Sequence, residues 1–283
     1  MPADAHWDLR HRDHPWPGVV SAVGYRTPQP DHPVHYGLPS PWLTVIFSLD
    51  DGVESANDRA ALSAAPPLPI IAAGLHTRSS FVRPRPGQSG VQLAVHPLAA
   101  RSLFGLPAAE LSVTEYDGRQ VLDRRATTTQ QRLTECVGWR DAFALLGGHL
   151  TRSLDRHHRI DVRSELRHAW SLLESSGGQR PIAEVAAQVG LTARHLGTLF
   201  TREVGQSPKT IAQLIRFQRS VELIRSSVSR TGRADLAGVA ARAGYADQSH
   251  LTRDFVERTG VPPTRWIAEE FRNLQDHGAP PAA

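Results

Sequence analysis

The stretch GYADQSHLTRDF (244–255) gathers hydrogen-bonding side chains around the polar run DQSH, and Thr252 and Arg253 follow it. Gln, Arg, Ser and Thr are the side chains that read base-pair edges in the major groove of DNA. Leu251 and Phe255 have the spacing that would anchor the opposite face of a helix in a core. The stretch is therefore typical of a helix that reads DNA, with an ordinary solvated helix face as the alternative.

An internal repeat decides how this stretch is interpreted. IAEVAAQVGLTARHLGTLFTREVGQSPKTI (182–211) matches LAGVAARAGYADQSHLTRDFVERTGVPPTRWI (236–267). Each copy predicts an Ala-rich helix, a turn at Gly190 or Gly244, and a second helix with an apolar face, which is the helix-turn-helix arrangement. A helical bundle with a duplicated hairpin is the structural alternative. Two copies joined by one long helix, from Thr210 to about Arg225, favour DNA binding.

On these residues, 165–272 resembles the DNA-binding domain of the AraC/XylS family of bacterial transcription regulators. The matching segments are VAAQVGLTARHLGTLFTREVGQSPKT, LIRFQRSVELIRSS and VAARAGYADQSHLTRDFVERTGVPPTRW. The resemblance implies a seven-helix domain with two helix-turn-helix units. It also implies that double-stranded DNA is the partner, contacted in two successive major-groove segments.

The resemblance also indicates which side chains would read bases. Arg253 suits a forked contact to guanine and Gln248 one to adenine. The first unit has a sparser face, because Gly197 lacks a side chain, and this suggests looser sequence readout or readout of DNA shape. The expected base-reading residues are Arg194, Thr198 and Thr201 in the first unit and Gln248, Ser249, Thr252 and Arg253 in the second.

Further polar residues follow each unit near the start of a helix, where backbone N–H groups and cations favour phosphate. Plain surface charge is the alternative for these residues. For the two histidines of the reading helices, packing in a half-buried position is an equal alternative. The expected phosphate contacts are His195, Lys209, Thr210, Arg216, His250, Thr264 and Arg265.

The N-terminal half has a different character. Its proline density to residue 40 excludes long helices, and strands are predicted at 19–25, 42–49 and 90–95. The segment 69–82 predicts a strand, a glycine turn and a second strand, and 97–105 a short helix after Pro97.

GVQLAVHPLAARSLFGLPAAEL (90–111) resembles the sensor domain of a subgroup of the same family, which implies a cupin-like β-domain followed by helices that can dimerise. The expected fold is therefore α+β. Residues 1–155 would form a sensor and dimerisation domain, 163–272 an all-α DNA-binding domain, and 273–283 a disordered tail.

Ten histidines in residues 1–158 raise the question of a metal site. The candidates are His32, His35, His76 and His96, and the rival function is a metal-dependent cupin-like enzyme fused to a helical module. No His-x-His with a following Glu at cupin spacing occurs, so structural or surface roles are favoured and neither a metal nor another cofactor is expected. No Gly-x-Ser-x-Gly motif or glycine-rich phosphate loop is present, which favours a regulator over an enzyme.

Composition adds weaker constraints. The formal net charge is +4, which alone would not indicate nucleic acid. No apolar run approaches the ~18 residues that span a bilayer, and the N-terminus lacks an apolar signal region, so a cytoplasmic protein is expected. Besides DNA, the candidate partners are a small-molecule effector, a second copy of the chain and RNA polymerase.

Overall fold

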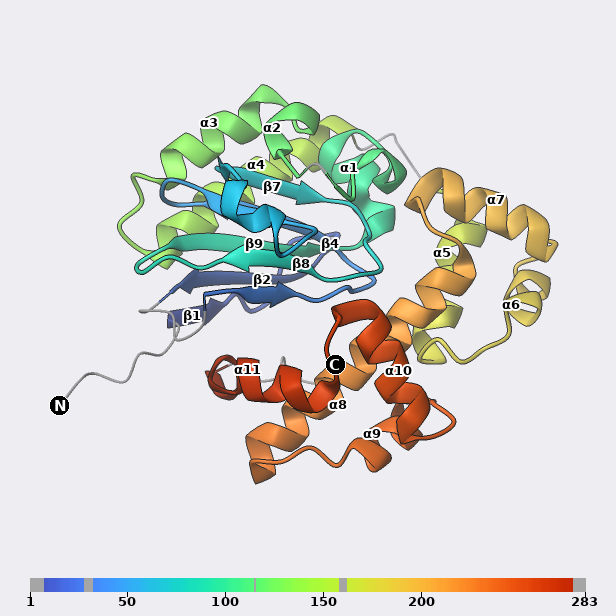
Figure 1. The fold of residues 1–283 in the computed structure, drawn as a ribbon. Coiled ribbons are helices and arrows are strands. Elements are labelled where there is room, and N and C mark those ends of the chain that lie inside the picture. The colour runs from blue at the N-terminus through green and yellow to red at the C-terminus, as the bar shows by residue number, and fades with distance from the viewer. Residues whose placement is uncertain (1–7, 28–32, 115, 158–161, 277–283) are drawn as a thin grey trace.

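The computed structural model describes residues 8–27, 33–114, 116–157 and 162–276. Figure 1 shows a β-rich N-terminal domain with its own helices, packed against an all-helical C-terminal domain. The expected α+β class is therefore confirmed. Among the described residues, no helix is both long enough and apolar enough to cross a membrane.

Two antiparallel sheets form the N-terminal domain. The five-stranded sheet has the order β1-β2-β9-β4-β7, and the four-stranded sheet has the order β3-β8-β5-β6. The strands are β1 (Asp8–His11), β2 (Val19–Arg26), β3 (His35–Gly37), β4 (Leu43–Ser48), β5 (Val53–Ala56), β6 (Pro67–Leu68), β7 (Ile70–Ala73), β8 (Ser80–Arg83) and β9 (Ser89–Val95).

The two strands expected within 69–82 are present, but they lie in different sheets. β7 pairs with β4 through Ile71 and Ile46, whereas β8 pairs with β5 and β3. The turn between them therefore connects the two sheets. β4 is almost entirely buried and has apolar side chains on both faces, as expected for a strand covered on both sides.

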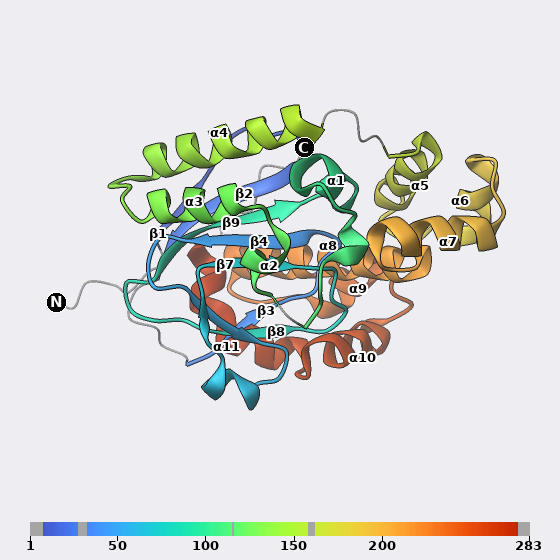
Figure 2. The same ribbon diagram turned by 90° about the horizontal axis from the view of Figure 1, so that it is seen from above.

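Helices cover one face of the five-stranded sheet. Figure 2 shows α3 and α4 side by side along this face, and Leu133 and Leu146 from them join the core that contains Phe47 and Leu93 of the sheet. The segment expected as a helix at 97–105 begins as a 3₁₀ turn and continues as α1. The helices are η1 (Ala61–Ala64), η2 (Pro97–Ala99), α1 (Ala100–Phe104), η3 (Ala108–Glu110), α2 (Gly118–Val121), α3 (Arg124–Leu133) and α4 (Trp139–His157).

The C-terminal domain consists, within the described residues, of the seven helices that the resemblance implied. The long helix α8 runs six residues beyond the predicted end at Arg225 and stops at Gly232, which has φ +71°. α11 continues to Asp276, and the remainder of the expected tail, 277–283, lies outside the described residues. The helices are α5 (Ser164–Ser175), α6 (Ile182–Gln188), α7 (Ala193–Val204), α8 (Pro208–Thr231), α9 (Leu236–Ala243), α10 (Gln248–Thr259) and α11 (Pro263–Asp276).

Candidate nucleic-acid interface

The first helix-turn-helix unit is formed by α6 and α7. Gly190 turns the chain between them with φ +70°, a conformation that L side chains rarely adopt. Thr192 caps α7 by accepting a hydrogen bond from the backbone N–H of His195 at 3.2 Å. Leu196 and Phe200 are fully buried on one face, which leaves the opposite face of α7 for a partner.

The second unit repeats this construction with α9 and α10. Gly244 makes the turn with φ +81°, and Asp247 caps α10 by accepting from the N–H of His250 at 2.7 Å. Leu251 and Phe255 are fully buried. The predicted anchor face of the opening stretch is therefore confirmed, and the aspartate of its polar run serves as the helix cap.

α8 holds the two units in one body. Its N-terminus follows α7, and Phe217 near its middle packs against Phe255 of α10 with ring centroids 5.3 Å apart. Phe255 in turn contacts Trp266 of α11 at 5.5 Å. Because these rings are fully buried or nearly so, the second unit cannot move along α8 without opening a packed core.

The side chains expected to read bases lie outside this core. Six of the seven are exposed, and Thr252 is half-buried. The side chains of Arg194, Gln248 and Arg253 make no hydrogen bond or ion pair with another described residue. A contact to a base would therefore cost them no intramolecular partner.

The expected phosphate contacts fall into two groups. His195, Lys209, Thr264 and Arg265 are exposed, although Arg265 is paired with Glu269 at 2.8 Å. The other three have structural contacts of their own. Arg216 lies 5.3 Å from the centre of the Tyr245 ring, His250 packs edge-on to that ring at 5.2 Å, and the Thr210 hydroxyl lies 2.9 Å from that of Ser207.

One cation that the sequence analysis did not select, Arg258, lies on the buried face of α10 itself. Arg258 is only 7% exposed and pairs with Asp254 one turn earlier, with Nε 2.9 Å from the carboxylate. Tyr245 donates its hydroxyl hydrogen to the same carboxylate at 2.7 Å. The i, i+4 spacing of Asp254 and Arg258 was the signal in the sequence that could have revealed this pair.

Three of the four candidate histidines, His35, His76 and His96, have structural contacts in the described part of the chain, where no group of three or more candidate metal ligands occurs. Burial by itself would lower the pKa of His35, but the carboxylate of Glu270, 3.1 Å away, raises it. Burial lowers the pKa of His76, and it lowers that of His96 to about 4. His32 lies outside the described residues.

Comparison with known proteins agrees with this geometry. Residues 185–269 match the family described as "Helix-turn-helix domain". The C-terminal helices form an AraC-type helix-turn-helix domain. The HTH-type transcriptional regulator Rv1931c of Mycobacterium tuberculosis is 30% identical over 91 residues, which are 32% of this chain and 33% of that protein. The chain thus spans about a third of the length of the curated relative it matches.

One solved structure extends the likeness to the whole fold. The crystal structure of an apo variant of ToxT from Vibrio cholerae superposes with a TM-score of 0.52 at 12% identity, covering 92% of this chain and 99% of that chain. A second ToxT structure has a TM-score of 0.49 at 14% identity and covers 88% and 97% of the two chains. At this identity the likeness concerns the fold, in which an AraC-type domain follows a β-rich domain.

Proposed function

We propose that this chain is a sequence-specific transcription regulator that acts through DNA binding rather than catalysis. The observation that carries the proposal is the pair of equivalent helix-turn-helix units with exposed reading faces on one rigid helical body. In this proposal residues 163–272 bind double-stranded DNA. Residues 1–155 receive a small-molecule effector, pair with a second copy of the chain, or do both.

The base-reading assignment follows from exposure and position. Gln248, Ser249, Thr252 and Arg253 read bases from α10, and Arg194, Thr198 and Thr201 read them from α7. Of the phosphate candidates, Lys209 and Thr264 have the strongest support, because each is exposed in the first turn of a helix that follows a unit. Contact with RNA polymerase and residence in the cytoplasm are parts of the same proposal.

The contacts between the domains support regulation by the N-terminal half. Arg101 of α1 forms an ion pair with Glu203 of α7, with N and O 2.6 Å apart. The side chain of Gln206, just after α7, donates to the carbonyl of Leu75 at 2.8 Å. The N–H of Ser79 donates to the carbonyl of Arg258 in α10 at 2.7 Å. The N-terminal domain thus holds the C-terminal end of each reading helix.

With these contacts, an effector bound to the N-terminal domain could change the affinity of the C-terminal domain for DNA. A ligand that binds the N-terminal domain more tightly in one arrangement of the domains than in another shifts the population towards the first arrangement. DNA that prefers one of the two arrangements is then coupled to the ligand by the same free energy. A metal-dependent enzyme, the rival hypothesis, is not favoured, because His35 is already engaged by Glu270.

Selection from genomic DNA tests the proposal. The full-length protein is incubated with sheared DNA from its source organism, and the retained fragments are sequenced. We expect enrichment of paired short motifs about 10 base pairs apart, as two units on one face of the duplex require. A double variant, Arg194→Ala with Arg253→Ala, is the matched control and should lose the enrichment. If the variant retains the same fragments, the reading helices are not the DNA-binding surface.

A further inference from the structure

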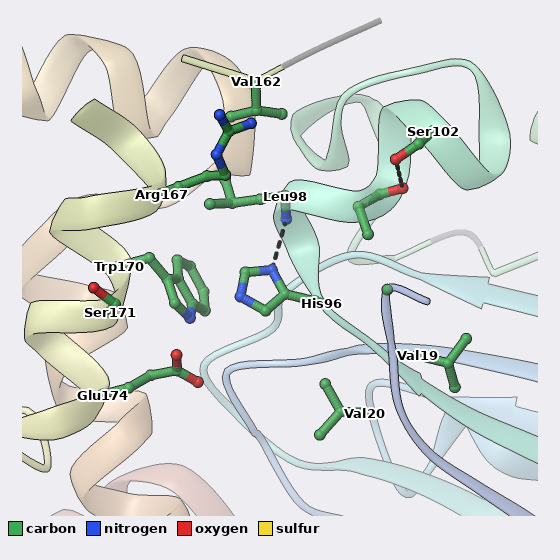
Figure 3. A pocket seen from close by; sticks show the side chains of 12 residues that line it. Val19, Val20, His96, Leu98, Ser102, Val162, Arg167, Trp170, Ser171 and Glu174 are labelled. Carbon is green, nitrogen blue, oxygen red and sulfur yellow. Dashed lines mark hydrogen bonds between the residues drawn. The ribbon is translucent and has the colours of Figure 1, made fainter. Parts of the chain in front are cut away.

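A cleft of about 530 Å³ lies where the N-terminal domain meets α5, the first helix of the DNA-binding domain. Figure 3 shows side chains from both domains around it. The volume lies within the range of small-molecule sites. Its apolar wall is formed by Val19, Val20, Leu98 and Val162, and its polar groups come from His96, Arg167, Trp170, Ser171 and Glu174.

Trp170 supplies a buried donor that makes no hydrogen bond of good geometry. The residue is 1% exposed, and its indole Nε1 has no hydrogen-bond partner in the described part of the chain. Figure 3 shows this edge of the ring on the side of Glu174. Buried N–H groups are nearly always satisfied, because an unpaired one costs free energy. An oxygen acceptor brought by a ligand would remove that cost.

His96 supplies a second donor beside the first. Its ring centroid lies 4.8 Å from that of Trp170, and its Nδ1 accepts the backbone N–H of Leu98 at 3.1 Å. Burial lowers the pKa of His96 to about 4, so the ring is neutral near pH 7. With Nδ1 accepting, the hydrogen of the neutral ring is on Nε2. Nε2 donates to no other described residue.

The charges of the cleft favour a ligand without net charge. Arg167 and Glu174 have opposite charges and both lie on α5. Desolvation raises the pKa of Glu174, and the indole N–H of Trp170, which is directed at this carboxylate without reaching hydrogen-bond geometry, opposes the change. A ligand carboxylate placed at the indole would approach the like charge of Glu174. A hydroxyl group avoids this repulsion, because it accepts from an N–H and also donates to a carboxylate.

We propose that this cleft binds an uncharged small molecule with a hydroxyl group on an apolar body. The hydroxyl oxygen accepts from Trp170 and His96, its hydrogen is donated to Glu174, and the body packs against Val20 and Leu98. The site itself stands on the geometry of the cleft. Only its consequence for DNA rests on the proposed function.

A route from the cleft to the first reading helix is visible in the packing. The ring of Trp170 stacks on that of Phe200 in α7, with centroids 6.2 Å apart and planes inclined by 7°. Phe200 is fully buried and anchors α7. A ligand that fixes Trp170 therefore acts one aromatic contact away from the helix that carries Arg194.

Three small probes with the same ring and different polar groups test the ligand class: cyclohexylmethanol, cyclohexanecarboxylate and cyclohexylmethylammonium. Each is titrated into isotope-labelled full-length protein while the indole N–H resonances are followed, and Trp170→Phe identifies the signal of interest. For fragments of this size we expect a Kd of roughly 1 mM. The alcohol should shift the Trp170 signal at a lower concentration than either charged probe does.

A blocking variant tests the location. Ser171→Trp places an indole in the cleft from an exposed position of α5, and Ser175→Trp adds the same group on α5 outside the lining. We expect the first to abolish the shift and the second to preserve it. No shift with any probe, a stronger shift with either charged probe, or a shift that survives Ser171→Trp would overturn the proposal.

DNA binding is measured separately, so that the two proposals can fail independently. If the alcohol binds and the operator affinity changes at least twofold, and Ser171→Trp removes the change, the cleft is an effector site. A shifted Trp170 signal without DNA binding under any condition leaves the ligand site standing and refutes the proposed function. Normal DNA binding without a shifted Trp170 signal refutes the ligand site and leaves the proposed function standing.

Discussion

Replacing Arg253 with alanine should weaken the recognition of a DNA sequence while leaving the stability of the fold nearly unchanged. The side chain is exposed on α10 and has no hydrogen-bond or ion-pair partner among the described residues, so its loss should change the free energy of unfolding by less than about 0.5 kcal/mol. A forked arginine–guanine contact contributes about 1–3 kcal/mol of discrimination. The affinity for the selected operator should therefore fall roughly 5- to 150-fold.

The assay measures affinity by fluorescence anisotropy. It uses the selected operator and operators with each base substitution at one position of the DNA segment that α10 is expected to contact. Measurement at several salt concentrations separates charge from base recognition, because each phosphate contact contributes about one unit to the salt slope. Arg230→Ala is the matched control, since it removes the same charge from an exposed arginine in the last turn of α8. Discrimination at one base pair should vanish in Arg253→Ala and persist in the control.

Two results would refute this reasoning. If affinity falls equally for all sequences and the salt slope becomes shallower by about one unit, Arg253 contacts a phosphate. If affinity is unchanged while the fold is intact, α10 does not enter the major groove in the expected way. An unfolding free energy lowered by more than about 1 kcal/mol would show that the side chain has a structural role.

Four further predictions concern the first helix-turn-helix unit and the stability of the fold. Arg194→Ala should reduce operator affinity less than Arg253→Ala in the same assay, and a larger effect would reverse the ranking of the two units. Gly178→Ala should lower the free energy of unfolding by at least about 3 kcal/mol, because a Cβ there would overlap a backbone carbonyl oxygen of α8 at φ +73°. Gly232→Ala, with φ +71° and open space around it, should lower the free energy of unfolding by only about 1–2 kcal/mol. Urea titration of both glycine variants measures the two losses. Burial in the folded state lowers the pKa of His96 to about 4, so the free energy of unfolding should fall by up to about 3 kcal/mol as the pH falls from about 6.5 to 4. The difference in unfolding free energy between the unchanged protein and His96→Gln should narrow over this range. A difference that stays constant would contradict the assigned pKa.

The helix-turn-helix units could be predicted because their signals are local. Gly190 and Gly244 mark turns that need a positive φ, and Thr192 and Asp247 have the polar oxygen that a helix start requires. The end of α8 also had a local signal, Gly232, which the apolar pattern alone did not reveal. In such segments a few neighbouring residues determine the backbone.

The N-terminal domain depends on contacts between residues distant in sequence. His35 meets Glu270 across 235 positions, and no spacing rule connects them. Likewise, nothing between β7 and β8 shows that the chain passes to the second sheet there. The hypothesis of a metal site arose for the same reason. The number of histidines does not show whether each imidazole ring is already hydrogen-bonded to a group such as Glu270 or a backbone N–H.

The pair formed by Asp254 and Arg258 gives the domain interface an electrostatic consequence for DNA. Asp254 follows Arg253 on α10, and its negative charge near phosphates would oppose binding. Arg258 offsets that charge at 2.9 Å, and its guanidinium also donates to the carbonyl of Thr77 in the N-terminal domain at 3.4 Å. A rearrangement that moved the segment around Thr77 would therefore change how fully Arg258 compensates Asp254. In the proposed regulator, the N-terminal domain would thus change the electrostatic field at α10 without touching the exposed face of that helix.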